Sequence, residues 1–196
     1  MGITAKDIQQ LRQDTGLGMM DCKAILKEAK GDYDKAIDIA RKRGEKVAAK
    51  KADRSTGQGL VDSYIHPGNQ VGVLIQVNCE TDFVAKNNEF KEMVHDLAMH
   101  VAAYNPLYVK PEDVPEDVLA KEKEIYKEQL LAEGKPEKMM DKIVEGKIEK
   151  YYEETCLLNQ SFLKNEDQTV KEYLEEKIAK IGENISIHRF ERFSLQ

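Results

Sequence analysis

Residues 71–88 read VGVLIQVNCETDFVAKNN, and this stretch decides the fold. Its first nine residues have a period of two. Val71, Val73, Ile75, Val77 and Cys79 alternate with Gly72, Leu74, Gln76 and Asn78. Such alternation is typical of a β-strand with one buried face, so we expect a strand over Val71–Cys79. From Glu89 the pattern becomes helical. The apolar stripe of this helix consists of Phe90, Met93, Val94, Leu97, Ala98 and Val101.

Phe83 lies in the junction between this strand and this helix, among acidic and amide residues. Two interpretations are open. The ring is an exposed anchor for a partner, since its burial is worth roughly 1.5–3 kcal/mol and binding energy concentrates in a few such side chains. Alternatively, the ring covers the core of its own chain, which general burial preferences favour.

Further strands flank the central one. Residues 60–66 alternate, with Leu60, Asp62, Tyr64 and His66 on one face, and residues 66–70 (HPGNQ) have turn chemistry. We therefore expect a hairpin with Val71–Cys79. Residues 185–195 are a final strand that returns to this hairpin.

The first 44 residues predict three short helices. Thr4 and Asp32 are N-cap candidates, and Gly16, Gly18, Gly31 and Gly44 are the expected breaks. This arrangement resembles a ubiquitin-associated domain. We expect a partner-binding bundle over residues 1–45, a basic linker over 46–58 and an α+β core over 59–196.

The second half of the chain predicts long charged helices. Residues 116–132 and 137–155 flank Gly134-Lys135-Pro136 and form a helical hairpin, and residues 169–181 form a helix that Gly182 ends. The fold class is α+β, in which helices cover a small antiparallel sheet.

Composition and charge distribution limit the kinds of function that the chain can have. The chain has 196 residues, 41% of them hydrophobic, and its net charge of −6 divides into +4 over residues 1–54 and −10 over the remainder. This balance disfavours general nucleic-acid binding. Residues 41–54 carry seven basic side chains, which indicates either a solvated helical linker or an RNA patch. Three widely spaced cysteines are an unusual set for a disulfide scaffold, so we expect reduced thiols. The sequence shows neither an apolar targeting segment nor a membrane span, so we expect a cytoplasmic protein.

The sequence offers little catalytic chemistry. No phosphate-binding loop is present, because Gly16 and Gly18 lack a third glycine and a preceding strand. The four histidines lack metal-ligand spacing, and nothing places a base beside Cys79. We therefore expect a binding protein with no cofactor and no metal of its own.

Met19 and Met20 open the second helix. Adjacent helical residues point about 100° apart, so we expect one to pack inside and the other to make an adaptable exposed contact. A loose corner in which both are half-buried is the alternative. Lys23 is one turn further on and lies at the same edge, as a charged contact or as a solvated side chain.

Two motifs carry a family resemblance. Residues 15–23 (TGLGMMDCK) and 77–86 (VNCETDFVAK) resemble the signature segments of the elongation factor Ts family. Ile181-Gly182-Glu183-Asn184, Arg189-Phe190 and Arg192-Phe193 resemble that family's C-terminus. Residues 105–155 are short beside members with a duplicated core, so the chain resembles the compact bacterial or organellar form.

The resemblance implies a guanine-nucleotide exchange factor for elongation factor Tu, in both its GDP-bound and nucleotide-free states. It implies that Thr81, Asp82, Phe83 and Val84 disturb the magnesium side of the partner's nucleotide site, with Phe83 as a wedge. It also implies that Met19, Met20 and, less directly, Lys23 press on the partner's nucleotide-binding domain. Homodimerisation stays open, with the sheet edge, the final strand and Cys156 as candidate contacts.

Two other functions stay open from the residues themselves. One is a ubiquitin-associated-type module that recognises ubiquitin or nascent peptide through residues 1–45. The other is an RNA- or ribosome-associated protein that uses Arg41–Arg54 and depends steeply on salt. The acidic remainder of the chain disfavours the second.

Overall fold

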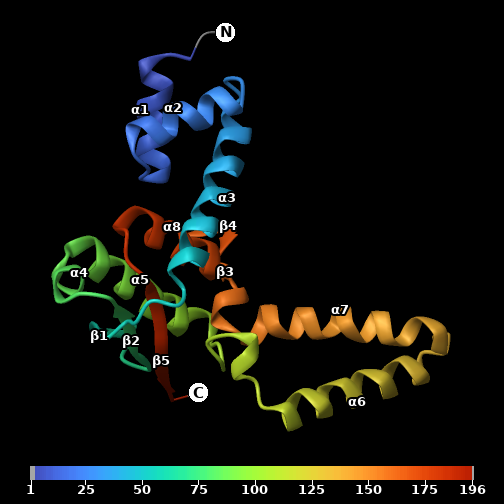
Figure 1. Ribbon diagram of the computed structural model, residues 1–196. Helices are drawn as coiled ribbons and strands as arrows, with labels where there is room; N and C mark the ends of the chain where they lie inside the picture. Colours follow the sequence, from blue (N-terminus) through green and yellow to red (C-terminus); the bar gives the residue numbers. More distant parts are fainter. Residues whose placement is uncertain (1–2, 196) are drawn as a thin grey trace. The chain divides into compact units, whose positions relative to one another are not determined.

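The computed structural model describes residues 3–195 and is an α+β fold, as predicted (Figure 1). The chain divides into two compact units. The first comprises residues up to 61, 76–94 and 171–187, and the second comprises 62–75, 95–170 and residues from 188 on. The helices are α1 (Ala5–Thr15), α2 (Met19–Glu28), α3 (Tyr33–Lys51), α4 (Asp82–Lys86), α5 (Asn88–Tyr104), α6 (Glu116–Ala132), α7 (Glu137–Thr155) and α8 (Val170–Ile181), with 3₁₀ turns at Pro111–Asp113 and Leu157–Asn159. The strands are β1 (Gln58–Ile65), β2 (Val71–Cys79), β3 (Ser161–Phe162), β4 (Asn165–Thr169) and β5 (Ile185–Ser194).

A three-helix bundle of α1, α2 and the start of α3 opens the first unit. The Thr4 hydroxyl accepts the N–H of Asp7 at 3.2 Å, and the Asp7 carboxylate accepts the N–H of Thr4 at 2.8 Å. This reciprocal cap fixes the start of α1. Gly16, at φ 67°, ends the helix in the left-handed region that favours glycine. The small core of the bundle contains Leu11, Cys22, Ile25, Leu26, Ala29, Ala36 and Ala40.

Helix α3 does not end at Gly44, contrary to the sequence expectation. It continues to Lys51, and Ala36, Ala40, Gly44 and Ala48 form one buried stripe of small residues. A Cβ at position 44 would lie 3.9 Å from the carbonyl oxygen of Glu175 in α8. That separation is an ordinary van der Waals contact, so the space around position 44 does not itself require a glycine, whose helix-propensity cost is about 1 kcal/mol relative to alanine. Most of the basic residues of 41–54 are therefore helical.

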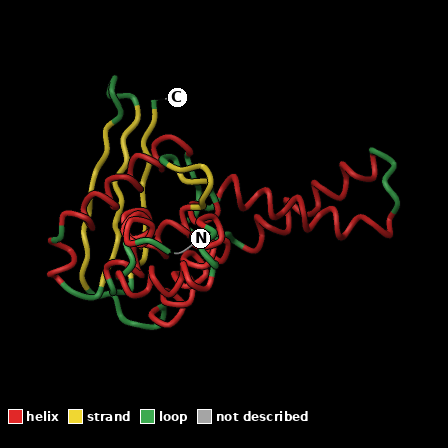
Figure 2. The backbone as a smooth tube through the Cα atoms, turned by 90° about the horizontal axis from the view of Figure 1, so that it is seen from above, coloured by secondary structure: helices red, strands yellow, loops and turns green. Residues whose placement is uncertain are grey.

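The main sheet has the strand order β1-β2-β5, with β2 in the centre (Figure 2). The predicted turn is present, with Gly68 at φ 97° and Asn69 at φ 56°. The main-chain N–H of Leu195 donates to the carbonyl of Gln70 at 3.1 Å, so the end of the chain lies beside the start of β2. Of the five side chains that the alternation predicted on one face of β2, Val73, Ile75, Val77 and Cys79 are buried, and Val71 at the start of the strand is half-buried. The predicted stripe of α5 is buried as well, at Phe90, Met93, Val94, Leu97, Ala98 and Val101.

The helical hairpin of α6 and α7 has the predicted boundaries, and the two helices lie side by side (Figure 1). Leu130, Val144 and Ile148 form its core. The short hairpin of β3 and β4 was not expected. It has few residues and a polar sequence, and it is held by a buried histidine: the N–H of Leu163 donates to Nδ1 of His100 at 3.1 Å.

The three cysteines are buried and form no disulfide. Burial raises the pKa of Cys22, Cys79 and Cys156, which keeps these thiols protonated at neutral pH. The buried position of Cys156 removes it as a surface candidate for contact between two copies. Within residues 3–195, no helix has the length and apolar character that crossing a bilayer requires.

Candidate partner-binding site

Helix α4 has five residues and follows β2 directly. Thr81 is its N-cap, with extended backbone and a hydroxyl that accepts the N–H of Val84 at 3.4 Å. One turn apart, Lys86 Nζ donates to Asp82 at 2.6 Å, an i,i+4 pair that suits the helix dipole. No residue of α4 is buried. The helix is therefore shaped by its caps and not by a hydrophobic core.

Phe83 projects from this helix with 81% of its surface exposed. The interpretation that its ring covers the chain's own core is wrong. The other residues expected at this site, Thr81, Asp82 and Val84, are half-buried at the base of the helix. A ring of this size gains roughly 1.5–3 kcal/mol only when a second surface covers it. The exposed phenylalanine is thus available as an anchor.

Asp82 adds a negative charge beside Phe83. The hydrogen bond from Lys86 holds the pKa of the Asp82 carboxyl below its ordinary value. The carboxylate is therefore ionised at neutral pH. Lys86 donates to Oδ2 of this carboxylate, which lies next to the residue that carries the ring.

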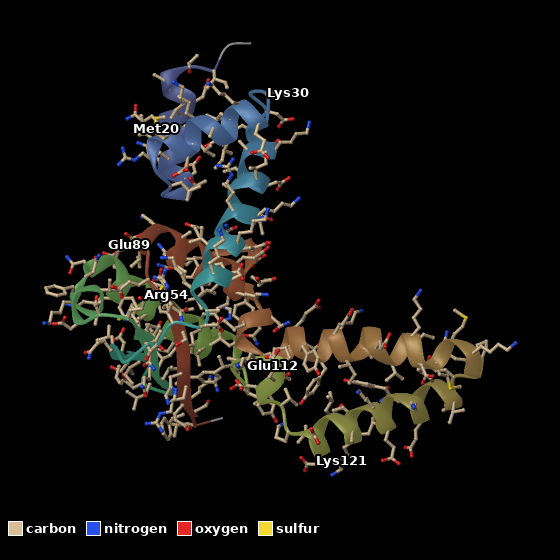
Figure 3. The ribbon with its side chains drawn as sticks, viewed as in Figure 1. Met20, Lys30, Arg54, Glu89, Glu112 and Lys121 are labelled. Carbon is tan, nitrogen blue, oxygen red and sulfur yellow. The ribbon has the colours of Figure 1, made fainter. Side chains whose placement is uncertain are left out.

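Met19, Met20 and Lys23 lie on the first turns of α2. The opposite side of this helix is buried in the bundle core through Cys22, Ile25 and Leu26. Met20 is 77% exposed and Met19 is 44% exposed, so the expectation that one methionine packs inside is wrong. Met19 is the more covered of the two because it lies three residues before buried Cys22. Figure 3 shows Met20 on the outside of α2, and Lys23 is exposed as well.

The structure thus places the expected site residues in two groups on two helices. Thr81–Val84 lie together at the start of α4, and Met19, Met20 and Lys23 lie together at the start of α2. Both groups offer exposed apolar side chains next to a charged one. Such patches are suited to binding a protein surface.

Three residues that support α4 were not singled out as site residues from the sequence. The Glu183 carboxylate accepts hydrogen bonds from Glu80 and Thr81, and the Glu80 carboxylate accepts one from the N–H of Asn184. The last of these bonds holds the pKa of the Glu80 carboxyl below its ordinary value. About a hundred residues of sequence separate the partners, so no local period announces them.

In the described part of the chain, no group of three or more His, Cys, Asp or Glu side chains is arranged to hold a metal ion.

Comparison with known proteins decides the family. The family model for elongation factor Ts matches residues 19–178, a range that includes both groups of site residues. The chain belongs to the elongation factor Ts family. Among curated members, the elongation factor Ts of Moorella thermoacetica is 56% identical over 193 residues, covering 98% of this chain and 95% of that protein. The elongation factor Ts of Syntrophus aciditrophicus is 53% identical over 195 residues, covering 100% of this chain and 97% of that protein.

This membership agrees with the resemblance inferred from residues 15–23 and 77–86. Another member, from Solibacter usitatus, is 56% identical over 193 residues and covers 98% of this chain and 91% of its own length. Family relationship therefore extends over nearly all of the sequence and is not confined to the short motifs.

Proposed function

We propose that this chain is a guanine-nucleotide exchange factor for elongation factor Tu, acting in the cytoplasm in translation elongation. The observation that carries the proposal is identity of 56% to elongation factor Ts over 98% of the chain. The exposed ring of Phe83 and the exposed methionines of α2 support it, because a factor that acts by binding needs such surfaces.

The mechanism is differential binding. An exchange factor binds the nucleotide-free partner more tightly than the GDP-bound one, and by reciprocity nucleotide weakens its binding by the same factor. The chain need only make contacts that differ between these two states. No bond is formed or broken, so no catalytic group is required.

In this proposal Phe83 is a wedge at the magnesium side of the partner's nucleotide site. Asp82 makes a polar contact beside it, while Thr81 and Val84 form the base of the wedge. The magnesium ion belongs to the partner. The exposure of Phe83 and the ionised state of Asp82 support these roles.

Met19 and Met20, with Lys23 beside them, form the second contact, on the partner's nucleotide-binding domain. Flexible thioether side chains adapt to an apolar surface as it changes between states. If the contact at α2 persists while Phe83 enters the partner, it keeps the two proteins bound to each other during GDP release. The exposed positions of both methionines support this role.

The test is release of a fluorescent GDP analogue from purified elongation factor Tu, chased with excess unlabelled GDP. Addition of the chain at a substoichiometric amount should accelerate release strongly, since each copy acts repeatedly. Unchanged release with a folded chain and a matched partner would contradict the proposal. Sedimentation of the free chain, and of its complex with elongation factor Tu in the same buffer, determines whether one copy or a homodimer is present in each.

A further inference from the structure

A carboxylate holds the N-terminus of α4 from the far end of the chain. Oε2 of Glu183 accepts the main-chain N–H of Glu80 at 3.1 Å and that of Thr81 at 3.0 Å. Oε1 of the same carboxylate accepts the Thr81 hydroxyl at 2.6 Å. Three donors from two adjacent residues thus converge on one side chain.

The reverse bond is also present. Oε1 of Glu80 accepts the main-chain N–H of Asn184 at 2.6 Å and Nη1 of Arg54 at 3.5 Å (Arg54 is labelled in Figure 3). Nδ2 of Asn184 donates to the carbonyls of Ala52 and Arg54 at 3.2 and 2.9 Å. We refer to Glu80, Thr81, Glu183 and Asn184 as the carboxylate clasp. It ties together the end of β2, the end of α8 and the segment after α3.

The clasp bears directly on Phe83. Thr81 is the N-cap of α4, and its hydroxyl donates to Glu183 while it accepts the N–H of Val84. The following amide, that of Ala85, donates to the Thr81 carbonyl at 3.2 Å. Because no residue of α4 is buried, these bonds, and not core packing, determine where the helix starts and where its second residue points.

We infer that Glu183 is a positioning residue for nucleotide exchange, which acts by holding Thr81 so that Phe83 is presented in one orientation. This inference rests on the proposed function. A wedge that is already ordered loses little freedom on entering its partner, whereas a loose one is competent for only a fraction of the time. In this inference Glu183 acts through Thr81, to which it is hydrogen-bonded, and not by direct contact with the partner. Asn184 and Glu80 serve the same end by fixing the segment that carries Glu183.

Kinetics of GDP release tests the inference. Glu183→Ala removes both carboxylate oxygens and so all three hydrogen bonds, and it should lower the maximal release rate at least about fivefold. The half-saturating concentration should change less than about twofold, because the contact at α2 remains. Glu183→Gln should retain most of the rate. Its amide oxygen can accept both main-chain N–H groups while its NH₂ faces the Thr81 hydroxyl. Glu191→Ala, which removes an exposed carboxylate from β5, is the matched control and should behave as the wild type.

A double-mutant cycle shows whether Glu183 acts through Phe83. In a Phe83→Ala background, Glu183→Ala should change the rate by less than about twofold, since the wedge is already gone. A loss equal to that seen with Phe83 present would overturn the inference, as would a wild-type rate for folded Glu183→Ala. Should Glu183→Ala melt below the assay temperature, Thr81→Val removes the same hydroxyl bond and should reproduce the loss of maximal rate.

Amide hydrogen exchange of the free chain tests the clasp without a partner. In Glu183→Ala the amides of Val84 and Ala85 should exchange faster, and those of α2 should not change. Unaltered protection at α4 would overturn the inference even if exchange activity fell. If instead the wild type fails to accelerate GDP release, the proposed function fails, whereas faster amide exchange in the variant would still support the clasp.

Discussion

Phe83 and Phe90 are seven residues apart and have opposite environments. Phe83 is 81% exposed on α4, whereas Phe90 is fully buried on α5. Burial of the Phe90 ring stabilises the fold, whereas the Phe83 ring is left mostly uncovered by its own chain. At the scale of single residues, the candidate site therefore presents apolar side chains that the fold leaves largely uncovered.

We predict that Phe83→Ala lowers the rate of GDP release from elongation factor Tu at least about tenfold, the equivalent of about 1.4 kcal/mol in the transition state. Its thermal melt should closely match that of the wild type, because the ring is 81% exposed and has little packing to lose. Phe90→Ala is the contrasting control and should cost about 3–5 kcal/mol of folding stability. A folded Phe83→Ala protein with wild-type exchange would exclude the wedge.

A second residue-scale prediction concerns Met20, which is 77% exposed. Met20→Ala should weaken the complex with elongation factor Tu by about 1–2 kcal/mol, the range of an interface contact. Calorimetric titration measures this loss, and the melting temperature of the free chain should not fall. Leu26→Ala, one turn and a half further along α2 and buried, should destabilise the chain instead. A collapse of folding in Met20→Ala would assign the methionine to the core.

At the scale of elements, the sequence predicted what local periodicity controls. The alternation of Val71–Cys79 defined β2, and Gly134-Lys135-Pro136 separated α6 from α7 at the observed bounds. The helix end expected at Gly44 was wrong, because a single glycine costs a helix only about 1 kcal/mol and the buried small residues on both sides of it pack as parts of one helix. The clasp was missed since its partners lie far along the chain, and the β3–β4 hairpin was missed since its few, mostly polar residues show no strand periodicity.

The candidate site was predictable in part. Phe83, Met19 and Met20 were named from the sequence, yet their exposure was not readable from it, and Met19 and Met20 were expected to differ more than they do. Exposure depends on which neighbours the fold brings near. Thr81 illustrates this: the sequence identifies it beside Phe83, whereas its bond to Glu183 spans 102 positions.

The β3–β4 hairpin gives a prediction about pH. His100 is buried, and burial lowers its pKa. Its Nδ1 accepts the N–H of Leu163 at 3.1 Å, so the neutral ring carries its proton on Nε2, which faces Oε1 of Gln160 at 3.0 Å. Because the unfolded chain binds this proton more readily, the stability that neutral His100 contributes is present above about pH 6.5 and is lost as pH falls below that value.

Urea unfolding at pH 7.5 and pH 5.5 measures this effect. The free energy of unfolding of the wild type should fall more between these two values than that of His100→Gln, which cannot titrate. Carboxyl groups whose pKa the fold lowers, such as Asp7 and Glu80, have ordinary pKa values below pH 5.5. They therefore contribute little to the difference in stability between pH 7.5 and pH 5.5. Burial raises the pKa of Glu175 and Glu176, which has the opposite effect and is common to both proteins. Equal losses in the two proteins would show that His100 does not titrate on unfolding.

At the scale of the whole molecule, the chain's last segment returns to its beginning within the first unit. Lys51 Nζ donates to the carbonyl of Gly182, and the hydroxyls of Thr56 and Ser186 lie 3.2 Å apart. Ile185 and Ile187 are buried on β5. Contacts over such separations have a high entropic cost of closure, so they must be supported by burial and hydrogen bonding together.

We therefore predict that truncation after Ile181 removes both stability and exchange activity. The shortened chain lacks Glu183, Asn184 and the apolar residues of β5, and loss of two buried isoleucines alone should cost about 4–10 kcal/mol, comparable to the stability of a typical domain. Circular dichroism should show a lost or greatly broadened thermal transition, and GDP release should be as slow as without the factor. Removal of only the last two residues is the control, since Leu195 is exposed and contributes one main-chain bond to Gln70. Cooperative melting of the chain truncated after Ile181, with exchange retained, would show that the N-terminal 181 residues form the active fold unaided.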